Sequence, residues 1–239
     1  MQKKALSLEW AQAIVTDLFA LLLVIGLYGL SLCRIKKKDT KIQKGAPVVL
    51  VHGYFNTGSV WAYIQRGLAK REIGPVFTVD LGNPFHSIEE HVETLATKIS
   101  QIEKETGRKD IILIGHSMGG VVSALYATQK GSLGKVTDVI TLGSPLSGTR
   151  VAKIGLGANA RDMELNSPLC QEVQALIRSN QTIRFYHVAS KTDILVMPYS
   201  SAWIDGPRHQ KLIVSGIGHV SLVFSPRILR QIVEWIRNR

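Results

Sequence analysis

A serine, an aspartate and a histidine follow three of the apolar runs in this 239-residue chain, in that order. Ser117 stands at the centre of a Gly-His-Ser-Met-Gly pattern. Asp193 follows the apolar stretch 183–189, and His219 follows the stretch 212–214. A serine hydroxyl is a weak nucleophile near neutral pH, so it needs a base within hydrogen-bond reach and a third group that orients the base. The three residue types predict nucleophilic catalysis by Ser117, with His219 as the base and Asp193 as the orienting acid.

The residues on both sides of Ser117 match what its exposure at a sharp turn requires. Residues 111–114 are apolar and read as a buried strand, and residues 121–130 are compatible with a helix. Strand, strained turn and helix are the arrangement of a nucleophile elbow. We expect glycines at 115 and 119 because the strand and the helix approach too closely there for Cβ atoms. The alternative is a glycine-rich turn with an incidental serine, and the flanking residues favour the functional interpretation.

Backbone N–H groups near the serine are the expected donors to a developing oxyanion. One belongs to Met118, directly after the serine at the start of the helix, where a helix also offers a partial positive charge. The other belongs to Tyr54, which follows the His52-Gly53 pair at the end of an apolar run. A plain turn is the alternative interpretation of that pair.

Other histidines and another aspartate compete for the same roles. Asp205 is the second candidate for the acid, and a turn or helix cap is the alternative role of Asp193. We expect the remaining histidines to be structural or on the surface: His52 in a strand-end turn, His116 within the elbow, His187 inside a strand, and His86, His91 and His209 in polar contexts.

Apolar runs alternate with helix-compatible stretches after residue 44. The expected strands are 47–52, 76–80, 111–114, 136–142, 183–189 and 212–214. The expected helices are 60–70, 87–105, 121–130 and 226–237. This alternation predicts an α/β fold with a doubly wound, mostly parallel sheet of about six strands. Ligands of such sheets bind at the carboxyl ends of the strands, which is where the three chemical residues occur.

The chain is strongly basic, and part of its positive charge is concentrated in residues 1–44. The net charge is +11, and residues 1–44 contain eight lysines and arginines against three acidic residues. The basic residues show no aromatic interleaving and no nucleic-acid module, so we expect no nucleic-acid partner. The two cysteines, Cys33 and Cys170, suggest neither a disulfide framework nor a metal site, and we expect no cofactor.

Residues 14–33 form an apolar stretch interrupted by Thr16, Asp17, Tyr28 and Ser31. Twenty helical residues are just long enough to span a hydrocarbon core of roughly 30 Å. The stretch exceeds a usual signal-peptide core, and a basic run follows it at once, which favours an uncleaved single-pass anchor. A cleaved signal peptide and an amphipathic or lipidated variant remain alternatives.

The predicted organisation is therefore an anchor and basic linker at 1–44 and a folded domain at 45–239, whose core does not depend on the anchor. Six basic residues at 34–44 would keep the domain cytoplasmic by the positive-inside rule, or bind an anionic membrane surface. We expect attachment to a bacterial inner membrane, and a secreted or periplasmic protein if the segment is cleaved.

From about residue 46 to residue 236, the chain resembles α/β-hydrolases of the small bacterial lipase and esterase type. The pieces that match are Val51-His52-Gly53-Tyr54, Gly115-His116-Ser117-Met118-Gly119-Gly120, Thr141-Leu142-Gly143-Ser144-Pro145, Asp193 with Val196-Met197-Pro198, and Gly218-His219. The resemblance implies a short, six-stranded α/β-hydrolase fold. It also implies hydrolysis of acyl esters through an acyl-enzyme, with Ser117, Asp193 and His219 as the triad.

The substrate is less sharply indicated. Residues 151–181 form the insertion able to cover the site, as a short mobile flap or as an ordinary crossover helix with its lead-in loop. A membrane anchor beside an apolar cleft favours a lipid or a long acyl ester, with a small soluble ester or an acyl thioester as alternatives. The alternative from another class is a catalytically silent, membrane-tethered binding module. The sequence does not indicate an oligomeric state.

Overall fold

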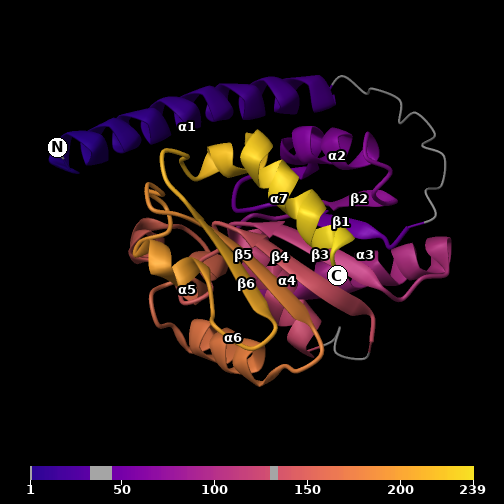
Figure 1. Cartoon of the computed structure of the whole chain (residues 1–239). Coiled ribbons are helices and arrows are strands. Elements are labelled where there is room, and N and C mark those ends of the chain that lie inside the picture. The colour runs from indigo at the N-terminus through magenta and orange to yellow at the C-terminus, as the bar shows by residue number, and fades with distance from the viewer. Residues whose placement is uncertain (1, 33–44, 130–133) are drawn as a thin grey trace.

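Six parallel strands form a single sheet in the computed structural model, which describes residues 2–32, 45–129 and 134–239 (Figure 1). The strand order is β2-β1-β3-β4-β5-β6. The strands are β1 (Val48–Val51), β2 (Val76–Val79), β3 (Ile111–His116), β4 (Val136–Leu142), β5 (Arg184–Ser190) and β6 (His209–Val214). The predicted fold class is confirmed. The order reverses between β1 and β3, so the loops that follow these two strands flank the crevice where doubly wound sheets bind ligands.

Helices cover both faces of the sheet. The α-helices are α1 (Gln2–Leu32), α2 (Ala62–Ala69), α3 (Ile88–Thr106), α4 (Met118–Gln129), α5 (Ala158–Asp162), α6 (Pro168–Ser179) and α7 (Pro226–Arg237). Short 3₁₀ helices include η1 (Gly58–Trp61), η3 (Arg150–Ile154), η4 (Tyr199–Ala202) and η5 (Val220–Phe224). Helices α3, α4 and α6 contribute to the core on one face, and α2 and α7 contribute to the core on the other.

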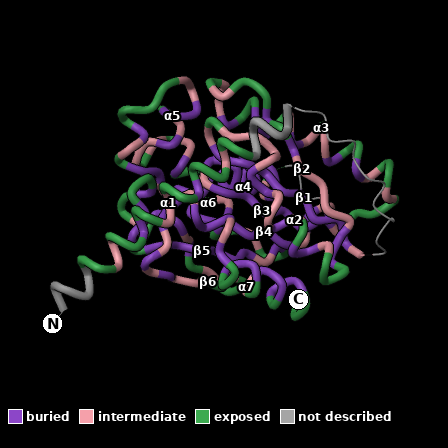
Figure 2. Tube along the Cα trace, turned by 90° about the horizontal axis from the view of Figure 1, so that it is seen from above, coloured by how far each residue is buried: buried purple, intermediate pink, exposed green. Residues whose placement is uncertain are grey.

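Successive side chains of the central strands contribute alternately to the cores on the two faces of the sheet. Val49 and Val51 of β1 pack with α3 and α4, whereas Val48 and Leu50 pack with α2 and α7. All four side chains are fully buried, and Figure 2 shows the central strands buried along their length. Successive strand residues point to opposite faces, so a strand covered on both sides must be continuously apolar. This requirement explains why β1 and β3 were recognisable from the sequence.

Several boundaries differ from the predicted ones for physical reasons. Helix α4 begins at Met118 rather than at residue 121, although Gly119 and Gly120 have low helix propensity. Tertiary packing holds this first turn, because both glycines lie against neighbouring backbone or side chains. Strand β6 begins at His209 rather than at residue 212. It is an edge strand whose first residues are partly exposed and polar, so they do not produce an apolar run.

Helix α1 lies on the side of the sheet that carries α2 and α7, along the top of the view in Figure 1. By length and composition, its segment Ser7–Gly26 is apolar enough to cross a membrane. The helix nevertheless contacts η5 and η1 of the folded domain. Its inward residues recur every three or four positions: Glu9, Ala13, Thr16, Asp17, Ala20 and Val24. Cys33 and the basic run 34–44 lie outside the described residues.

Candidate active site

Ser117 occupies the strained turn between β3 and α4. Its φ angle is +54°, in the left-handed region that residues other than glycine rarely adopt. Its N–H donates to the Leu142 carbonyl at 2.9 Å, which ties the turn to β4. A Cβ atom at position 115 would collide with the Gly119 backbone, and one at position 119 would collide with the Val51 carbonyl. The predicted need for glycine at both positions is confirmed.

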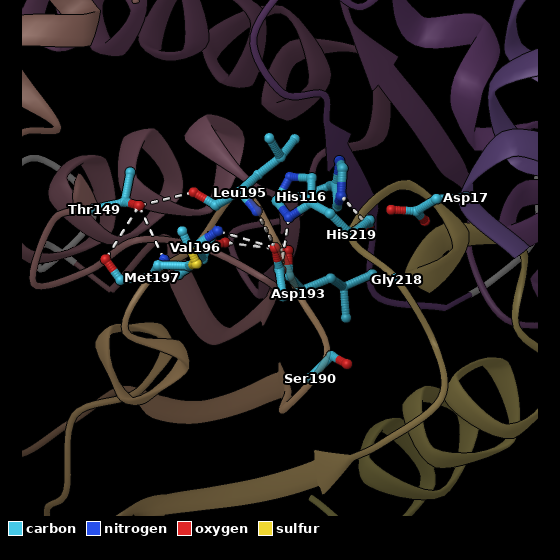
Figure 3. A network of polar contacts seen from close by, with 12 residues as sticks. Asp17, His116, Thr149, Ser190, Asp193, Leu195, Val196, Met197, Gly218 and His219 are labelled. Atoms are coloured by element: carbon cyan, nitrogen blue, oxygen red, sulfur yellow. Dashed lines mark hydrogen bonds and ion pairs between the residues drawn. The ribbon is translucent and has the colours of Figure 1, made fainter. Parts of the chain in front are cut away.

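The structure brings His219 and Asp193 together in the interior. The imidazole Nδ1 of His219 lies 2.7 Å from the Asp193 Oδ2, and the two side chains are 3% and 1% exposed (Figure 3). The other carboxylate oxygen of Asp193 accepts hydrogen bonds from the backbone N–H groups of Leu195 at 2.8 Å and Val196 at 2.9 Å. Both oxygens are thus engaged, which fixes the plane of the carboxylate against the imidazole.

The second candidate for the acid lies elsewhere. Asp205 is on the surface, where its carboxylate pairs with the Lys211 ammonium at 2.7 Å. Its side chain is 76% exposed. The contact with His219 is therefore made by Asp193 and not by Asp205, while the catalytic role of Asp193 stays a prediction.

The surroundings of His219 favour its charged form. Burial lowers the pKa of His219, but the adjacent Asp193 carboxylate and the more remote Asp17 carboxylate more than offset this effect, so the pKa is raised above 6.5. The cation that forms when His219 accepts a proton is stabilised in place. A histidine whose protonated form is stabilised by a carboxylate can accept a proton as a general base and then return it as a general acid.

His116 supports the same histidine from the elbow. Its Nε2 lies 3.1 Å from the backbone carbonyl of His219, and the two rings are 4.8 Å apart. Burial, together with the nearby His219, lowers the pKa of His116 to about 3. His116 is therefore neutral in the physiological range, and its Nε2–H donates to the His219 carbonyl without adding charge to the site.

The remaining histidines divide into buried and half-exposed ones. His187 is buried in β5 with Nδ1 2.9 Å from the Thr141 hydroxyl, as expected for a core residue. The prediction of a surface place for His91 was wrong, because its side chain is fully buried beside the Leu81 carbonyl. Its position on the inward face of α3 could have been read from the helical spacing. His86 and His209 are half-buried.

The turn after β1 lies directly against the elbow. His52 accepts a hydrogen bond at Nε2 from the Leu81 N–H at 3.1 Å and contacts the Gly53 carbonyl through Nδ1 at 2.8 Å. A Cβ atom at Gly53 would lie 2.9 Å from the Ser117 Cβ, so only glycine fits there. Tyr54 and Ser117 both line the same cavity. Whether the N–H groups of Tyr54 and Met118 bind an oxyanion stays a prediction.

A cavity of about 290 Å³ opens above Ser117 and His219. Its lining is mostly apolar and comes from the β1 turn, the elbow, the insertion and the segments around Leu195 and His219. Among the exposed large apolar side chains of the described domain, Ile154 and Leu195 line this cavity, and Phe55, Leu156, Ile194 and Met197 are next in the chain to residues that line it. Such a rim suits a substrate with an apolar portion.

The insertion 151–181 contains the predicted crossover helix, and whether its first part acts as a mobile flap stays a prediction. Its first part, with η3 and α5, lines the cavity, and its second part is the crossover helix α6. The Tyr54 hydroxyl donates to the Leu156 carbonyl at 2.5 Å and accepts from the Leu156 N–H at 3.2 Å. The Ala158 N–H donates to the Phe85 carbonyl at 3.0 Å. The first part of the insertion is therefore hydrogen-bonded both to the turn after β1 and to the segment before α3.

Two residues at the site were missed from the sequence. Thr149 is buried, and its hydroxyl donates to the Leu195 carbonyl at 2.8 Å and accepts from the Met197 N–H at 2.9 Å. It holds the loop that carries Asp193. Asp17 of α1 accepts a hydrogen bond from the Ser221 N–H at 2.8 Å, two residues after His219. The sequence signal for Asp17 was a carboxylate inside an apolar stretch.

Within the described residues, no group of three or more metal-ligating side chains could hold a metal ion.

Known protein structures include chains with a similar fold. A lipase of Bacillus licheniformis in its mature form has a TM-score of 0.71 at 16% identity, covering 84% of this chain and 96% of that one. At this identity the likeness shows the fold alone. It agrees with the α/β architecture described above.

Curated relatives match over shorter stretches. Ethanol acetyltransferase 1 of Wickerhamomyces ciferrii is 32% identical over 111 residues, which are 45% of this chain and 28% of the relative. The sn-1-specific diacylglycerol lipase of Xenopus laevis is 33% identical over 92 residues, which are 37% of this chain and 30% of the relative. This chain thus spans about a third or less of the length of these two relatives. A family model for the alpha/beta hydrolase fold matches residues 46–191. The chain belongs to the α/β-hydrolase fold family.

Proposed function

We propose that the protein is a serine hydrolase that cleaves acyl esters through an acyl-enzyme intermediate. The observation that carries the proposal is the buried 2.7 Å contact between His219 and Asp193 beside a cavity that also contains Ser117. A buried imidazole–carboxylate pair, with its outer nitrogen free to face a serine, is the arrangement that activates a hydroxyl nucleophile. No sequence pattern alone carries as much weight, because a Gly-x-Ser-x-Gly match arises by chance.

In this mechanism, His219 Nε2 takes the proton of the Ser117 hydroxyl while the serine oxygen bonds to the ester carbonyl carbon. The tetrahedral intermediate collapses, the ester C–O bond breaks, and His219 returns the proton to the leaving alcohol. Water then attacks the acyl-enzyme by the reverse proton path and releases the acid. Asp193 holds Nδ1–H and stabilises the imidazolium without taking the proton.

The oxyanion formed in each half-reaction would be bound by the N–H groups of Tyr54 and Met118. Support comes from the close approach of the Gly53-Tyr54 turn to Ser117 and from the place of Met118 at the first position of the twelve-residue helix α4. N–H groups at a helix start have no partner within the helix and carry a partial positive charge. Each such preorganised donor commonly contributes 10²-fold or more to the rate, on the order of 3 kcal/mol of transition-state stabilisation.

An acyl chain or a lipid is the substrate class that the cavity favours. The cavity is lined mainly by apolar groups, and its lining includes the exposed side chains of Ile154 and Leu195. The diacylglycerol lipase relative is consistent with such a substrate. Small soluble esters and acyl thioesters would use the same chemistry.

A second candidate activity is transfer of the acyl group to an alcohol. The similarity to ethanol acetyltransferase 1 favours it. The acyl-enzyme is common to both activities, and they differ only in whether water or an alcohol accepts the acyl group. The ratio of acid to new ester, measured in mixtures of a p-nitrophenyl ester with ethanol, separates the two.

We further propose that α1 attaches the enzyme to a membrane while it stays docked on the domain. Its outward residues include nine exposed large apolar side chains: Leu8, Ile14, Val15, Leu18, Phe19, Leu21, Leu22, Leu23 and Ile25. Its inward contacts run from Glu9 to Val24, a length of about 22 Å at 1.5 Å per residue. A helix held along the domain over that length favours lying in the membrane surface over the single-pass span predicted for residues 14–33.

The test of the catalytic proposal is covalent labelling by a fluorophosphonate probe, which reacts with activated serines. We expect one label on Ser117, identified by peptide mass spectrometry, and no label after heat denaturation. Absence of labelling in a folded sample that binds acyl ligands would instead favour the silent binding module.

A further inference from the structure

The 3₁₀ helix η5 begins directly after His219 and lacks a cap from its own chain segment. Its N-cap residue is His219, whose side chain makes no capping hydrogen bond because Nδ1 is engaged with Asp193. The first N–H groups of any helix need acceptors from outside the helix. Here the Ser221 N–H donates at 2.8 Å to the Asp17 carboxylate of α1, which is 204 residues away in the sequence.

Further contacts join α1 to the same loop. The Thr16 and Ser221 hydroxyls are 3.2 Å apart, and the Ser221 hydroxyl donates to the Gly218 carbonyl at 3.1 Å. A Cβ atom at Gly218 would collide with the Asp17 carboxylate, so the loop and the helix are in van der Waals contact there. Figure 3 shows Asp17 beside Gly218 and His219. Asp17 therefore lies at the backbone on both sides of the histidine.

The opposite side of the loop is held by the catalytic domain itself. The His116 imidazole donates to the His219 carbonyl at 3.1 Å, and the Thr192 hydroxyl donates to the Ile217 carbonyl at 3.2 Å. The Ser190 hydroxyl also donates to the Ile217 carbonyl. The His219 loop is thus fixed by β3 and β5 from within and by α1 from outside, and only the outer contact depends on the N-terminal segment.

We propose that Asp17 is a positioning residue for catalysis: it caps η5, fixes the backbone that carries His219, and adds a negative charge near the imidazole. The inference rests on the proposed function, because it concerns the geometry of the base in that reaction. It gives the N-terminal helix a role in turnover in addition to attachment. Docking of α1 would then set how well His219 is aligned with Ser117.

The charged groups around the imidazole are few, so the effect of Asp17 can be isolated. Asp193 contacts Nδ1 from the loop after β5, and Asp17 approaches from α1. His116 approaches from β3, but its burial keeps it neutral. Loss of the Asp17 charge should therefore lower the pKa of His219, because one of the two carboxylates that raise it is removed.

Asp17→Ala, Asp17→Asn and the control Asp205→Asn in the full-length chain test the inference. Kinetics are measured on a soluble p-nitrophenyl ester in detergent, across pH. We expect Asp17→Ala to lower kcat on the order of 10-fold with little change in KM, since misalignment of a catalytic group slows chemistry more than binding. Asp17→Asn retains a carbonyl oxygen that accepts from Ser221, so it should keep more of kcat but move the acid limb of kcat/KM to lower pH.

A merely structural role would not move the pH profile, which makes the Asn variant the deciding one if Asp17→Ala folds poorly. The positioning role is overturned if Asp17→Ala keeps wild-type kcat, or if the acid limb of Asp17→Asn coincides with those of wild type and Asp205→Asn. Ser117→Ala is measured in parallel. If it stays active, the proposed function itself fails. If it is inactive while the Asp17 variants match wild type, only the present inference fails.

Discussion

The imidazole of His219 and the carboxylate of Asp193 form an almost fully buried pair, with Nδ1 and Oδ2 2.7 Å apart. The pair is held from several directions: the Leu195 and Val196 N–H groups fix the carboxylate, and His116 fixes the backbone of the histidine. Both side chains are almost fully shielded from solvent, so their interaction is stronger than that of an exposed ion pair.

The first prediction concerns the nucleophile. Ser117→Ala should lower kcat for p-nitrophenyl esters on the order of 10⁶-fold, because the proposed acyl-enzyme forms on the Ser117 hydroxyl. The fold should persist, since the change removes one hydroxyl at the cavity. The measurement is steady-state kinetics with a circular dichroism check. Ser100→Ala, an exposed serine on α3, is the matched control. Activity of Ser117→Ala equal to that of the control would contradict the assignment.

The second prediction separates the two candidate acids. Asp193→Asn should lower kcat on the order of 10⁴-fold, because an amide in that place favours the wrong imidazole tautomer and does not stabilise the imidazolium. Asp205→Asn should change kcat less than two-fold, since that carboxylate is exposed and paired with Lys211. The reverse ranking of the two variants would assign the acid to Asp205.

The third prediction is the pH dependence of the wild-type enzyme. His219 must be neutral to take the serine proton, so kcat/KM should rise with pH as the imidazolium loses its proton. Burial lowers the pKa of His219, but the two carboxylates raise it by more, so the pKa lies above 6.5. The acid limb of the kcat/KM profile should therefore also lie above pH 6.5. In Asp193→Asn, any residual activity should show a limb at lower pH. A wild-type limb at or below pH 6.5 would mean that desolvation dominates.

The sequence predicted most of the sheet and much of the site because the relevant constraints are local. Continuous apolar runs such as 48–51 and 111–114 are required of strands buried on both faces. Glycines at 115 and 119 are required by close backbone approach. Chain order then predicted that Asp193 and His219 come from neighbouring strand ends, and β5 and β6 are indeed adjacent.

Contacts between distant segments could not be predicted in this way. Thr149 holds the Asp193 loop through two hydrogen bonds, yet nothing in its neighbours along the chain marks it. Residues 14–33 were interpreted as an apolar span interrupted by a few polar residues, whereas in α1 mostly small and polar residues face the domain and most of the large apolar residues are exposed. Asp17 was noted only as an interruption of that stretch. Its partner is the Ser221 N–H, which only the tertiary fold brings near.

The fourth prediction concerns removal of residues 1–44. The sequence alone predicts a soluble domain that still cleaves a short, water-soluble ester. The structure changes this expectation, because the deletion also removes the Asp17 cap of η5 and the contacts of Thr16 and Glu9 with the His219 loop. We expect residues 45–239 to leave the membrane fraction and to retain a folded sheet. Their kcat on a soluble ester should fall on the order of 10-fold, as in Asp17→Ala.

Cell fractionation, intact-mass spectrometry and kinetics on matched samples of both chain lengths check this prediction. Circular dichroism controls for folding, because an unfolded truncated chain would lose activity for a trivial reason. The full-length Asp17→Ala variant is the second control: it should lose a similar part of kcat yet remain in the membrane fraction, since the outward apolar residues of α1 are unchanged. Equal kcat for the truncated and full-length chains would contradict the role of α1 in turnover. A mature chain that begins at or after Cys33 and is found in the soluble fraction would contradict attachment through α1.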